Sequence, residues 1–152
     1  MTRVCSFFVP GTPVPQPRAR VTTRGKVARA YVPSGHPVHA WRQAIALVGQ
    51  NAWRKPPLDQ AIGADWWFWV PRPKSHYGTG KNAGKLKPSA PKHPTSRAHG
   101  DAKNLLTAAE DALEGILYRD DTLLCDSLPR KRYATPEQPA GVRVTLYTLE
   151  TT

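Results

Sequence analysis

Acidic residues are missing from most of this chain. No Asp or Glu precedes Asp59, and none lies between Trp66 and Gly100. In the same regions Lys and Arg are frequent, with nine in residues 1–58 and seven in residues 71–97. The net charge is +11, and such zoned basicity is typical of proteins that bind a polyanion. The charge pattern therefore predicts a nucleic-acid partner.

Long apolar runs and cysteines are also scarce. No apolar run approaches the ~18 residues of a membrane-spanning helix, so no such helix is expected. The N-terminal segment, MTRVCSFFVPG, has too short an apolar run for a secretory signal. The two cysteines, Cys5 and Cys125, have no C-x-x-C spacing. We therefore expect reduced, buried thiols in a cytoplasmic protein, and neither a disulfide nor a thiolate-bound metal.

The apolar pattern predicts a single domain over residues 1–152. Short apolar runs indicate strands, and apolar positions at helical spacing indicate two amphipathic helices. The expected strands cover residues 3–9, 27–32, 61–70, 122–134 and 141–150, and the expected helices cover residues 38–53 and 102–116. The order β-β-α-β-α-β-β is typical of an α+β domain with a mixed sheet and both helices packed on it.

Three tryptophans occur in the expected central strand at residues 61–70. In a strand, Trp67 and Trp69 share one face and Trp66 points to the other. We expect Trp67 and Trp69 to pack in the core. The alternative is that these rings stack on unpaired bases, as aromatic side chains do in proteins that bind single strands.

A long basic loop follows this strand. Residues 71–100 have no apolar period, many Gly and Pro residues, and no acid. A loop of this length is usually functional or disordered. We expect contacts to DNA phosphates from basic residues in this loop and near the N-terminus: Arg18, Arg20, Arg24, Lys26, Arg72, Lys74, Lys81, Lys85 and Lys87. No residue resembles a base reader, so recognition of backbone and shape is expected.

Seven of the eleven carboxylates occur between residues 99 and 126. Asp101 precedes the second helix as an N-cap would, and Asp120 and Asp121 follow its far end. If the next strand folds back along the helix, these acids converge and require a cation such as Mg²⁺. The acids between them are interpreted as a solvated or salt-bridged helix face: Glu110, Asp111 and Glu114.

The residues alone support two functions equally, a metal-dependent nuclease and a DNA-binding module without catalysis. A third class, a structural protein that binds RNA or a protein partner, lacks an RNA-recognition signature. Histidines add little to the choice. His36 and His39 stand at a helix start, where surface or capping roles are expected rather than a metal pair. His99 is interpreted as an incidental loop residue.

The segment GDAKNLLTAAEDALEGILYRDDTLLCD, residues 100–126, resembles the signature of phage-type RusA endodeoxyribonucleases, which resolve Holliday junctions. That signature is Asp-x-Asp-Asn-Leu-x-Lys, then Asp-Ala-Leu, then Asp-Asp. The N-terminal FFVPGTPVPQPRARVTTRG and the basic loop are also similar to family segments, so the resemblance spans roughly residues 7–126. Asp101 matches the first acid, and Asp120 with Asp121 matches the final pair. Asn104-Leu105 and Asp111-Ala112-Leu113 match the motifs between them.

Two signature positions differ. Lys103 stands where the family has its second acid, and Thr107 stands where it has a lysine. An ammonium at a ligand position removes one oxygen and opposes the cation. Three explanations remain open: a natural member that binds but does not cleave, an active member in which Asp111, Asp120 or Asp126 supplies the missing oxygen, or two introduced changes.

The resemblance implies a fold, a partner and an ion. It implies an α+β nuclease, encoded by a phage or its bacterial host and acting in the cytoplasm, that cuts four-way DNA junctions as a homodimer. It implies Mg²⁺, with Mn²⁺ as the alternative. Asp101 and Asp121 would be the catalytic acids that hold the ion, with Asp120 as an auxiliary ligand.

Overall fold

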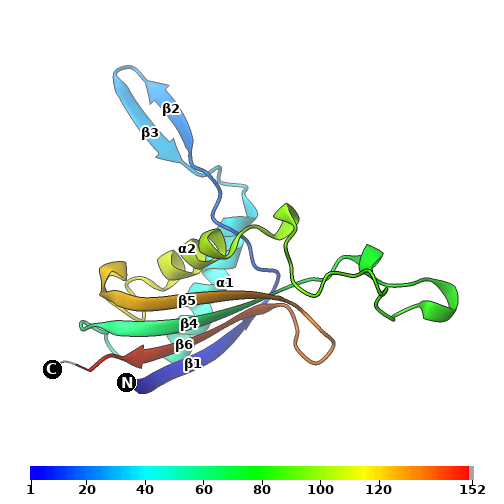
Figure 1. Cartoon of the computed structure of the whole chain (residues 1–152). Coiled ribbons are helices and arrows are strands. Elements are labelled where there is room, and N and C mark those ends of the chain that lie inside the picture. The colour runs from blue at the N-terminus through cyan, green and yellow to red at the C-terminus, as the bar shows by residue number, and fades with distance from the viewer. Residues whose placement is uncertain (151–152) are drawn as a thin grey trace.

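A four-stranded mixed sheet organises the chain (Figure 1). The computed structural model describes residues 1–150, with the side chain of Arg24 excepted. The strand order is β1 (Thr2–Pro10), β6 (Gly141–Thr148), β4 (Ile62–Val70) and β5 (Leu124–Tyr133). The β4–β5 pair is parallel, whereas β1–β6 and β4–β6 are antiparallel. The predicted α+β class, the mixed sheet and the central position of β4 are confirmed.

Two amphipathic helices cover one face of the sheet, as predicted. α1 (Pro37–Ala52) packs against β1, and α2 (Ala102–Leu113) packs against α1, β4 and β5. The α1–α2 contact is close at Gly49, where an added Cβ would lie 2.6 Å from a methyl carbon of Leu113. The helix faces and the sheet together form one apolar core, so Leu113→Ala would cost roughly 2–5 kcal/mol of stability.

Helix capping follows the sequence. The His36 side chain caps α1 by accepting a hydrogen bond from the backbone N–H of Val38 at 3.1 Å. This confirms the capping role expected for that histidine. Asp101 caps α2 by accepting from the backbone N–H of Asn104 at 2.7 Å. Each cap satisfies an N–H group that the first turn of a helix leaves without a partner.

The burial of the three tryptophans in β4 is the reverse of the prediction. Trp66 is fully buried in the core, and its indole N–H donates to the Ser127 hydroxyl at 2.9 Å. Trp67 and Trp69 lie on the opposite face and are partly exposed. The helices cover the face that also carries Phe68 and the other apolar residues at even positions. The expectation of core packing for Trp67 and Trp69 was therefore wrong.

An extra strand precedes α1. β2 (Arg20–Arg24) and β3 (Val27–Tyr31) form a separate antiparallel hairpin that projects from the body of the protein (Figure 1). The ribbon turns at residues 25–26, and the predicted element order has one strand too few, because it lacks β2. The described residues of this hairpin are exposed, because the ribbon projects from the body and its main contacts are between its own two strands.

Besides two isolated β-bridges, Tyr77 with Leu86 and Gly78 with Ala83, the basic loop has only short helical turns. They are η1 (Lys74–His76), η2 (Gly80–Asn82) and η3 (Arg97–His99). Tyr133 of β5 is the point at which the start of the loop attaches to the sheet. The Arg72 guanidinium lies 4.1 Å from the centre of the Tyr133 ring and donates to the Pro91 carbonyl at 2.8 Å. The loop is thus fixed at its base and reaches away from the sheet (Figure 1).

The cysteines differ in part from the prediction. Both thiols are free, as expected, but Cys5 is half-buried and Cys125 is exposed. Cys125 is the second residue of the edge strand β5. The expectation of buried thiols was therefore wrong for Cys125. None of the helices in residues 1–150 has the length and apolar character needed to cross a membrane.

Candidate functional site

Asp101 lines a pocket at the start of α2. The pocket has a volume of about 380 Å³, and its polar wall includes Asn104, Arg97 and Lys131. Both oxygens of the Asp101 carboxylate contact Asn104, one at its backbone nitrogen (2.7 Å) and the other at its side-chain amide (3.3 Å). Asp101 is nevertheless exposed, so its carboxylate remains open to a cation from solvent. The pocket thus combines one acid with two cationic side chains.

The walls of this pocket come from the bases of both basic segments. Pro15 and Gln16 belong to the strand-free stretch that leads into the β2–β3 hairpin, and residues 95–97 end the long loop. A backbone hydrogen bond from Gln16 to the Asn104 carbonyl (2.9 Å) attaches the first segment to α2. The Asp101 pocket therefore lies where the bases of the hairpin and of the basic loop meet α2.

Lys131 reaches the pocket from β5. Its ammonium donates to the Gly100 carbonyl at 2.8 Å. Gly100 has a φ of 75°, and a Cβ there would lie 2.6 Å from the Pro15 ring. Glycine is therefore required for both the backbone conformation and the close approach. An ammonium has three donors, so Lys131 retains N–H groups for a phosphate.

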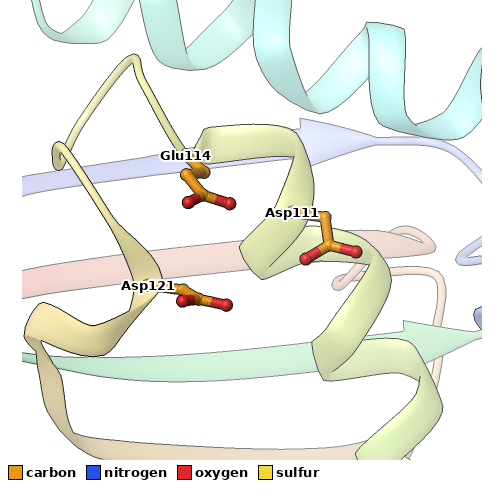
Figure 2. A group of neighbouring side chains, drawn as sticks. All are labelled: Asp111, Glu114 and Asp121. Carbon is orange, nitrogen blue, oxygen red and sulfur yellow. The ribbon is translucent and has the colours of Figure 1, made fainter.

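A second acidic group lies at the other end of α2. Oxygens of Asp111, Glu114 and Asp121 lie within 4.8 Å of one another, and all three side chains are exposed. Figure 2 shows the three carboxylates gathered between the last turn of α2 and the segment that leads into β5. Arg42 of α1 lies 3.5 Å from Asp111, which is the salt-bridged helix face that the sequence predicts.

Asp120 is occupied by local contacts. Its carboxylate accepts from the backbone N–H of Thr122 at 2.9 Å and caps the short helix η4 (Asp121–Leu123). Hydrogen bonds from Thr122, the backbone one foremost, lower the pKa of Asp120. Asp120 is thus ionised over the physiological range, and a metal ion would compete with the turn for this carboxylate.

The two acidic ends of α2 do not meet within one chain. Asp111 follows Asp101 by ten residues, about 15 Å along a helix axis, and Asp121 lies with Asp111. Two oxygens on one Mg²⁺ are at most ~4.2 Å apart. β5 does fold back along α2, as expected, but it brings Lys131 to the Asp101 end and leaves Asp121 behind. The predicted single-chain convergence of Asp101 with Asp120 and Asp121 is therefore wrong in this conformation.

Glu110 connects α2 to β5 between these ends. Its carboxylate accepts from the Ser127 hydroxyl at 2.8 Å, and its backbone carbonyl accepts from the Tyr118 hydroxyl at 2.6 Å. Partial burial is the main cause that raises the pKa of Glu110, against the opposing hydrogen bond from Ser127. Burial also raises the pKa of Tyr118 far above its usual range. Glu110 is thus a structural contact rather than part of a solvated face.

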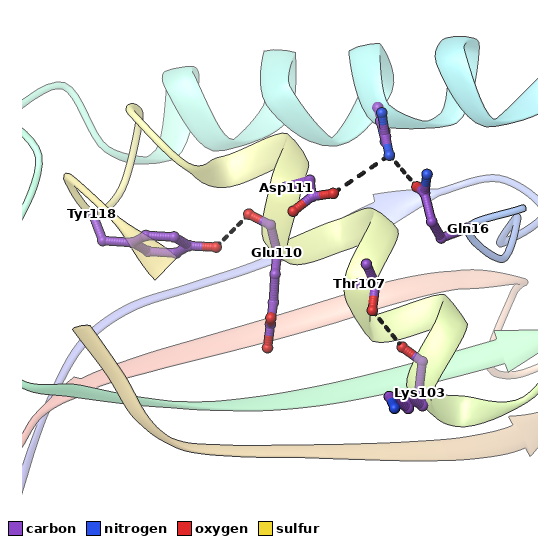
Figure 3. A network of polar contacts seen from close by, with 7 residues as sticks. Gln16, Lys103, Thr107, Glu110, Asp111 and Tyr118 are labelled. Carbon is purple, nitrogen blue, oxygen red and sulfur yellow. Dashed lines mark hydrogen bonds and ion pairs between the residues drawn. The ribbon is translucent and has the colours of Figure 1, made fainter. Parts of the chain in front are cut away.

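Lys103 and Thr107 are neighbours on α2. The Thr107 hydroxyl donates to the Lys103 backbone carbonyl at 3.0 Å, one helical turn away (Figure 3). This contact keeps the hydroxyl on the helix itself. The Lys103 side chain is exposed in the first turn of α2, two residues after Asp101. Its positive charge therefore lies at the end of the helix that carries Asp101.

Most predicted phosphate contacts are exposed on the two basic segments. The side chain of Arg24 lies outside the described residues, and Arg72 is bound to the base of the loop. The other exposed candidates are Arg18, Arg20 and Lys26 on the hairpin side and Lys74, Lys81, Lys85 and Lys87 on the loop. No interaction in the described part of the chain occupies these seven with an acid, so they are available to a polyanion.

His99 has a more defined environment than expected. Its ring meets the Tyr133 ring edge-on at 6.1 Å, and its Nε2 is buried without a hydrogen-bond partner among the described residues. Burial first, and the nearby Lys131 second, lower the pKa of His99. The neutral ring is therefore favoured, and the histidine packs the loop end against β5.

Sequence reasoning missed Arg97 and Lys131. Lys131 belongs to the run Arg130-Lys131-Arg132, which is unusual for a strand and was the available signal. Arg97 closes the basic loop two residues before His99. Both were hidden because the pocket depends on the register of β5 on β4, in which Lys131 pairs with Phe68. That register places the lysine beside the start of α2.

Comparison with known families agrees with this arrangement. The family model described as Endodeoxyribonuclease RusA matches residues 10–147 of the 152-residue chain. The match includes both basic segments, the whole of α2 and the acids at both of its ends. The chain belongs to the RusA endodeoxyribonuclease family, a family of Holliday junction resolvases.

Proposed function

We propose that this RusA family member cuts branched DNA at four-way junctions by Mg²⁺-dependent hydrolysis of a phosphodiester bond, with Mn²⁺ as the alternative ion. One observation carries the proposal. The Asp101 pocket combines a carboxylate with Arg97 and Lys131 at the base of two exposed basic segments. The basic segments would hold the DNA backbone, and the pocket would receive one of its phosphates.

Arg97 and Lys131 would bind that phosphate. A guanidinium and an ammonium offer charge-assisted hydrogen bonds, which are stronger than neutral ones. Lys131 would supply the positive charge that the family signature assigns to the position of Thr107. Because Lys131 is anchored on the Gly100 carbonyl, its charge is held near Asp101 without a rearrangement on DNA binding.

The acids fit a hard cation. Asp101 at one end of α2, and Asp121 with Asp111 and Glu114 at the other, offer only carboxylate oxygens, which Mg²⁺ prefers. The bound ion would activate water and neutralise charge on the phosphate. Asp120 would remain an auxiliary ligand, because Thr122 holds its carboxylate. Lys103 opposes a cation near Asp101, which predicts weak activity.

A homodimer is part of the proposal. A four-way junction has near two-fold symmetry, and resolution requires two opposed cuts, which two copies related by a two-fold axis can make. Light scattering at micromolar concentration should report a dimer, with or without junction DNA. A monomer under both conditions would contradict this part of the proposal.

A second function is favoured by the same pocket. Asp101 is the single carboxylate among the residues that line it in the described structure. A chain that binds junctions without cutting them would show this arrangement as well. Binding in EDTA should then be strong and salt-sensitive, with log K falling by ~0.9 per phosphate contact for each unit of log salt.

Cleavage of a labelled four-way junction in Mg²⁺ separates the two functions. The parent chain should cut, Asp101→Asn should not, and Asp59→Asn should cut as the parent does. Asp59 is a suitable control because its carboxylate forms an exposed ion pair with Arg119 at 2.9 Å, outside the pocket.

Two results would decide against the proposal. A parent chain that binds junctions but cuts them in neither Mg²⁺ nor Mn²⁺ is the non-catalytic binding protein. Equal affinity for a junction and a linear duplex in EDTA, at one salt concentration, removes the structural selectivity.

A further inference from the structure

The face of the sheet opposite the helices carries an ordered set of aromatic rings and guanidinium groups. Trp67 and Trp69 of β4 are stacked, with ring centres 6.0 Å apart and planes inclined by 15°. Phe8 of β1 meets Trp69 edge-on at 6.1 Å. The three rings are partly exposed, because the core and both helices lie on the other face. We call this surface, with its arginines, the open face.

Arginines from the neighbouring strands lie over these rings. The guanidinium carbons of Arg130 and Arg132 lie 4.8 and 5.4 Å from the centre of a Trp67 ring. Arg143 of β6 lies 5.6 Å from the centre of the Phe8 ring. Cation–π contacts of this kind order the guanidinium planes over the aromatic surface. The rings and cations thus form one continuous surface rather than scattered exposed residues.

Strand register explains the continuity. Phe8 pairs with Arg143, Arg143 with Trp67, and Trp67 with Arg130, which forms one row across all four strands. Trp69 pairs with Arg132 in the next row on the same face. Neighbouring strands lie ~4.8 Å apart, so the row is about 14 Å long. A four-stranded sheet with such aromatics accommodates two or three stacked bases in known nucleic-acid-binding domains.

The charge of the open face indicates which kind of ligand it binds. Arg130 has a carboxylate partner, Asp65, at 3.7 Å. Within residues 1–150, Arg132 and Arg143 form no ion pair. Phosphates of a single strand would neutralise these two cations while its bases contact the rings, which is the recognition that single-strand binders use. A double helix buries its base faces and cannot make the second contact.

The open face is continuous with the basic loop. Trp69 is one residue from the end of β4, and the loop begins directly after that strand. A strand that leaves the loop can therefore reach the rings without crossing an acidic surface.

We propose that the open face binds unpaired bases of single-stranded DNA, such as those exposed where the strands of a junction exchange. The inference rests on the proposed function, because it assigns a second contact to the same DNA. The surface lies on the opposite side of the sheet from α2 and its acids. Its role is to hold a displaced strand, not to cut it.

Binding of a fluorescein-labelled oligothymidylate in EDTA tests the inference. Trp67→Leu and Trp69→Leu should each weaken binding about tenfold, because base–aromatic stacking contributes ~1–3 kcal/mol per base. Trp53→Leu is the matched control. Trp53 also has a cation over its ring, Lys55 at 5.4 Å, but it lies at the end of α1 and should bind as the parent does.

Salt dependence separates the rings from the cations. The leucine variants should lower affinity by the same factor at every salt concentration. Arg132→Gln and Arg143→Gln should each reduce the slope of log K against log salt by ~0.7, the value for one phosphate contact on a single strand. These surface changes keep the test decisive if a tryptophan variant does not fold.

Three results would overturn the inference. The first is a parent that binds paired junctions, with leucine and glutamine variants that fold and bind oligothymidylate as the parent does. This result would show that the open face does not bind single strands, and it would leave the proposed function intact. The second is a dimeric parent whose open-face variants are monomers, which assigns the surface to a second copy. The third is a parent that binds no DNA, which defeats the proposed function as well.

Discussion

The two ends of α2 carry acids in opposite electrostatic settings. At the start of the helix, Asp101 lies in a pocket with Arg97 and Lys131, between two basic segments. At its other end, Asp121 lies with two further carboxylates, one of which, Asp111, forms an ion pair with Arg42. The first setting suits a site where DNA and a cation meet. The second concentrates negative charge that repels DNA unless a cation is bound.

This difference shows why acids in sequence proximity need not form one site. The strand after α2 returns along the helix, but its length and register deliver a lysine to Asp101. The end that faces the basic segments is therefore the end at which we propose that DNA binds, and Asp101 is the one carboxylate among the described residues that line its pocket. Lys103, which is exposed in the first turn of α2, belongs to this same end.

The largest expected effect comes from restoring the signature at the Asp101 end. The double change Lys103→Asp and Thr107→Lys adds a carboxylate ligand and a cation. Cleavage of a labelled junction in Mg²⁺ should rise about 100-fold or more, since a single transition-state contact contributes 10²–10³-fold in other enzymes. Adding Asp101→Asn should abolish the gain. A double variant that folds and binds junctions but cuts no faster than the parent would contradict the assignment.

A smaller effect is expected from the cations of the pocket. Arg97→Gln and Lys131→Gln should each weaken junction binding in EDTA by about tenfold and reduce the salt slope by ~0.9. Arg119→Gln is the control, because Arg119 is an exposed arginine paired with Asp59 outside the pocket. Filter binding over a series of salt concentrations measures both quantities. Equal losses of junction affinity in all three variants would show that the cations of the Asp101 pocket contribute no more to DNA binding than an arginine outside it.

Much of the Asp101 end could be predicted from sequence. An Asp before an apolar helical face indicates an N-cap, and the cap is present. The partners of Asp101 could not be predicted, because Lys131 arrives through the pairing of two strands separated by the whole of α2. The aromatic run of β4 was ambiguous in the same way. Both faces carry tryptophan, but Asp65 shares its face with Trp67 and Trp69, which was the signal for the exposed side.

Capping separates the structural role of Asp101 from its charge. Asp101→Ala should lower the free energy of unfolding by about 1 kcal/mol, the usual cost of losing an N-cap. Asp101→Asn should cost much less, because asparagine caps equally well. Urea unfolding followed by circular dichroism measures both variants. If Asp101→Ala and Asp101→Asn lower the free energy of unfolding equally, the charge of Asp101 rather than its cap hydrogen bond stabilises α2. The asparagine variant would then change stability as well as function.

The smallest effect concerns Glu110, between the two ends. Its pKa in the folded chain is raised, mainly by burial. Folding therefore favours the protonated form, and this contribution to stability is lost as pH rises from the unfolded value of ~4.3 through the folded one. Glu110→Gln should be slightly more stable than the parent at pH 7 and not at pH 4. Urea unfolding midpoints of both proteins at both pH values test this. A parent that is more stable than Glu110→Gln at pH 7 would contradict it.

Junction binding by Asp101→Asn and Asp121→Asn in EDTA tests the central claim most directly, because it requires no catalysis. If the start of α2 faces DNA, removing the Asp101 charge relieves its repulsion of a phosphate beside Arg97 and Lys131. Asp101→Asn should then bind a four-way junction several-fold more tightly than the parent, and Asp121→Asn should bind as the parent does. Tighter binding by Asp121→Asn with no change in Asp101→Asn would place DNA at the other end of the helix and contradict the account.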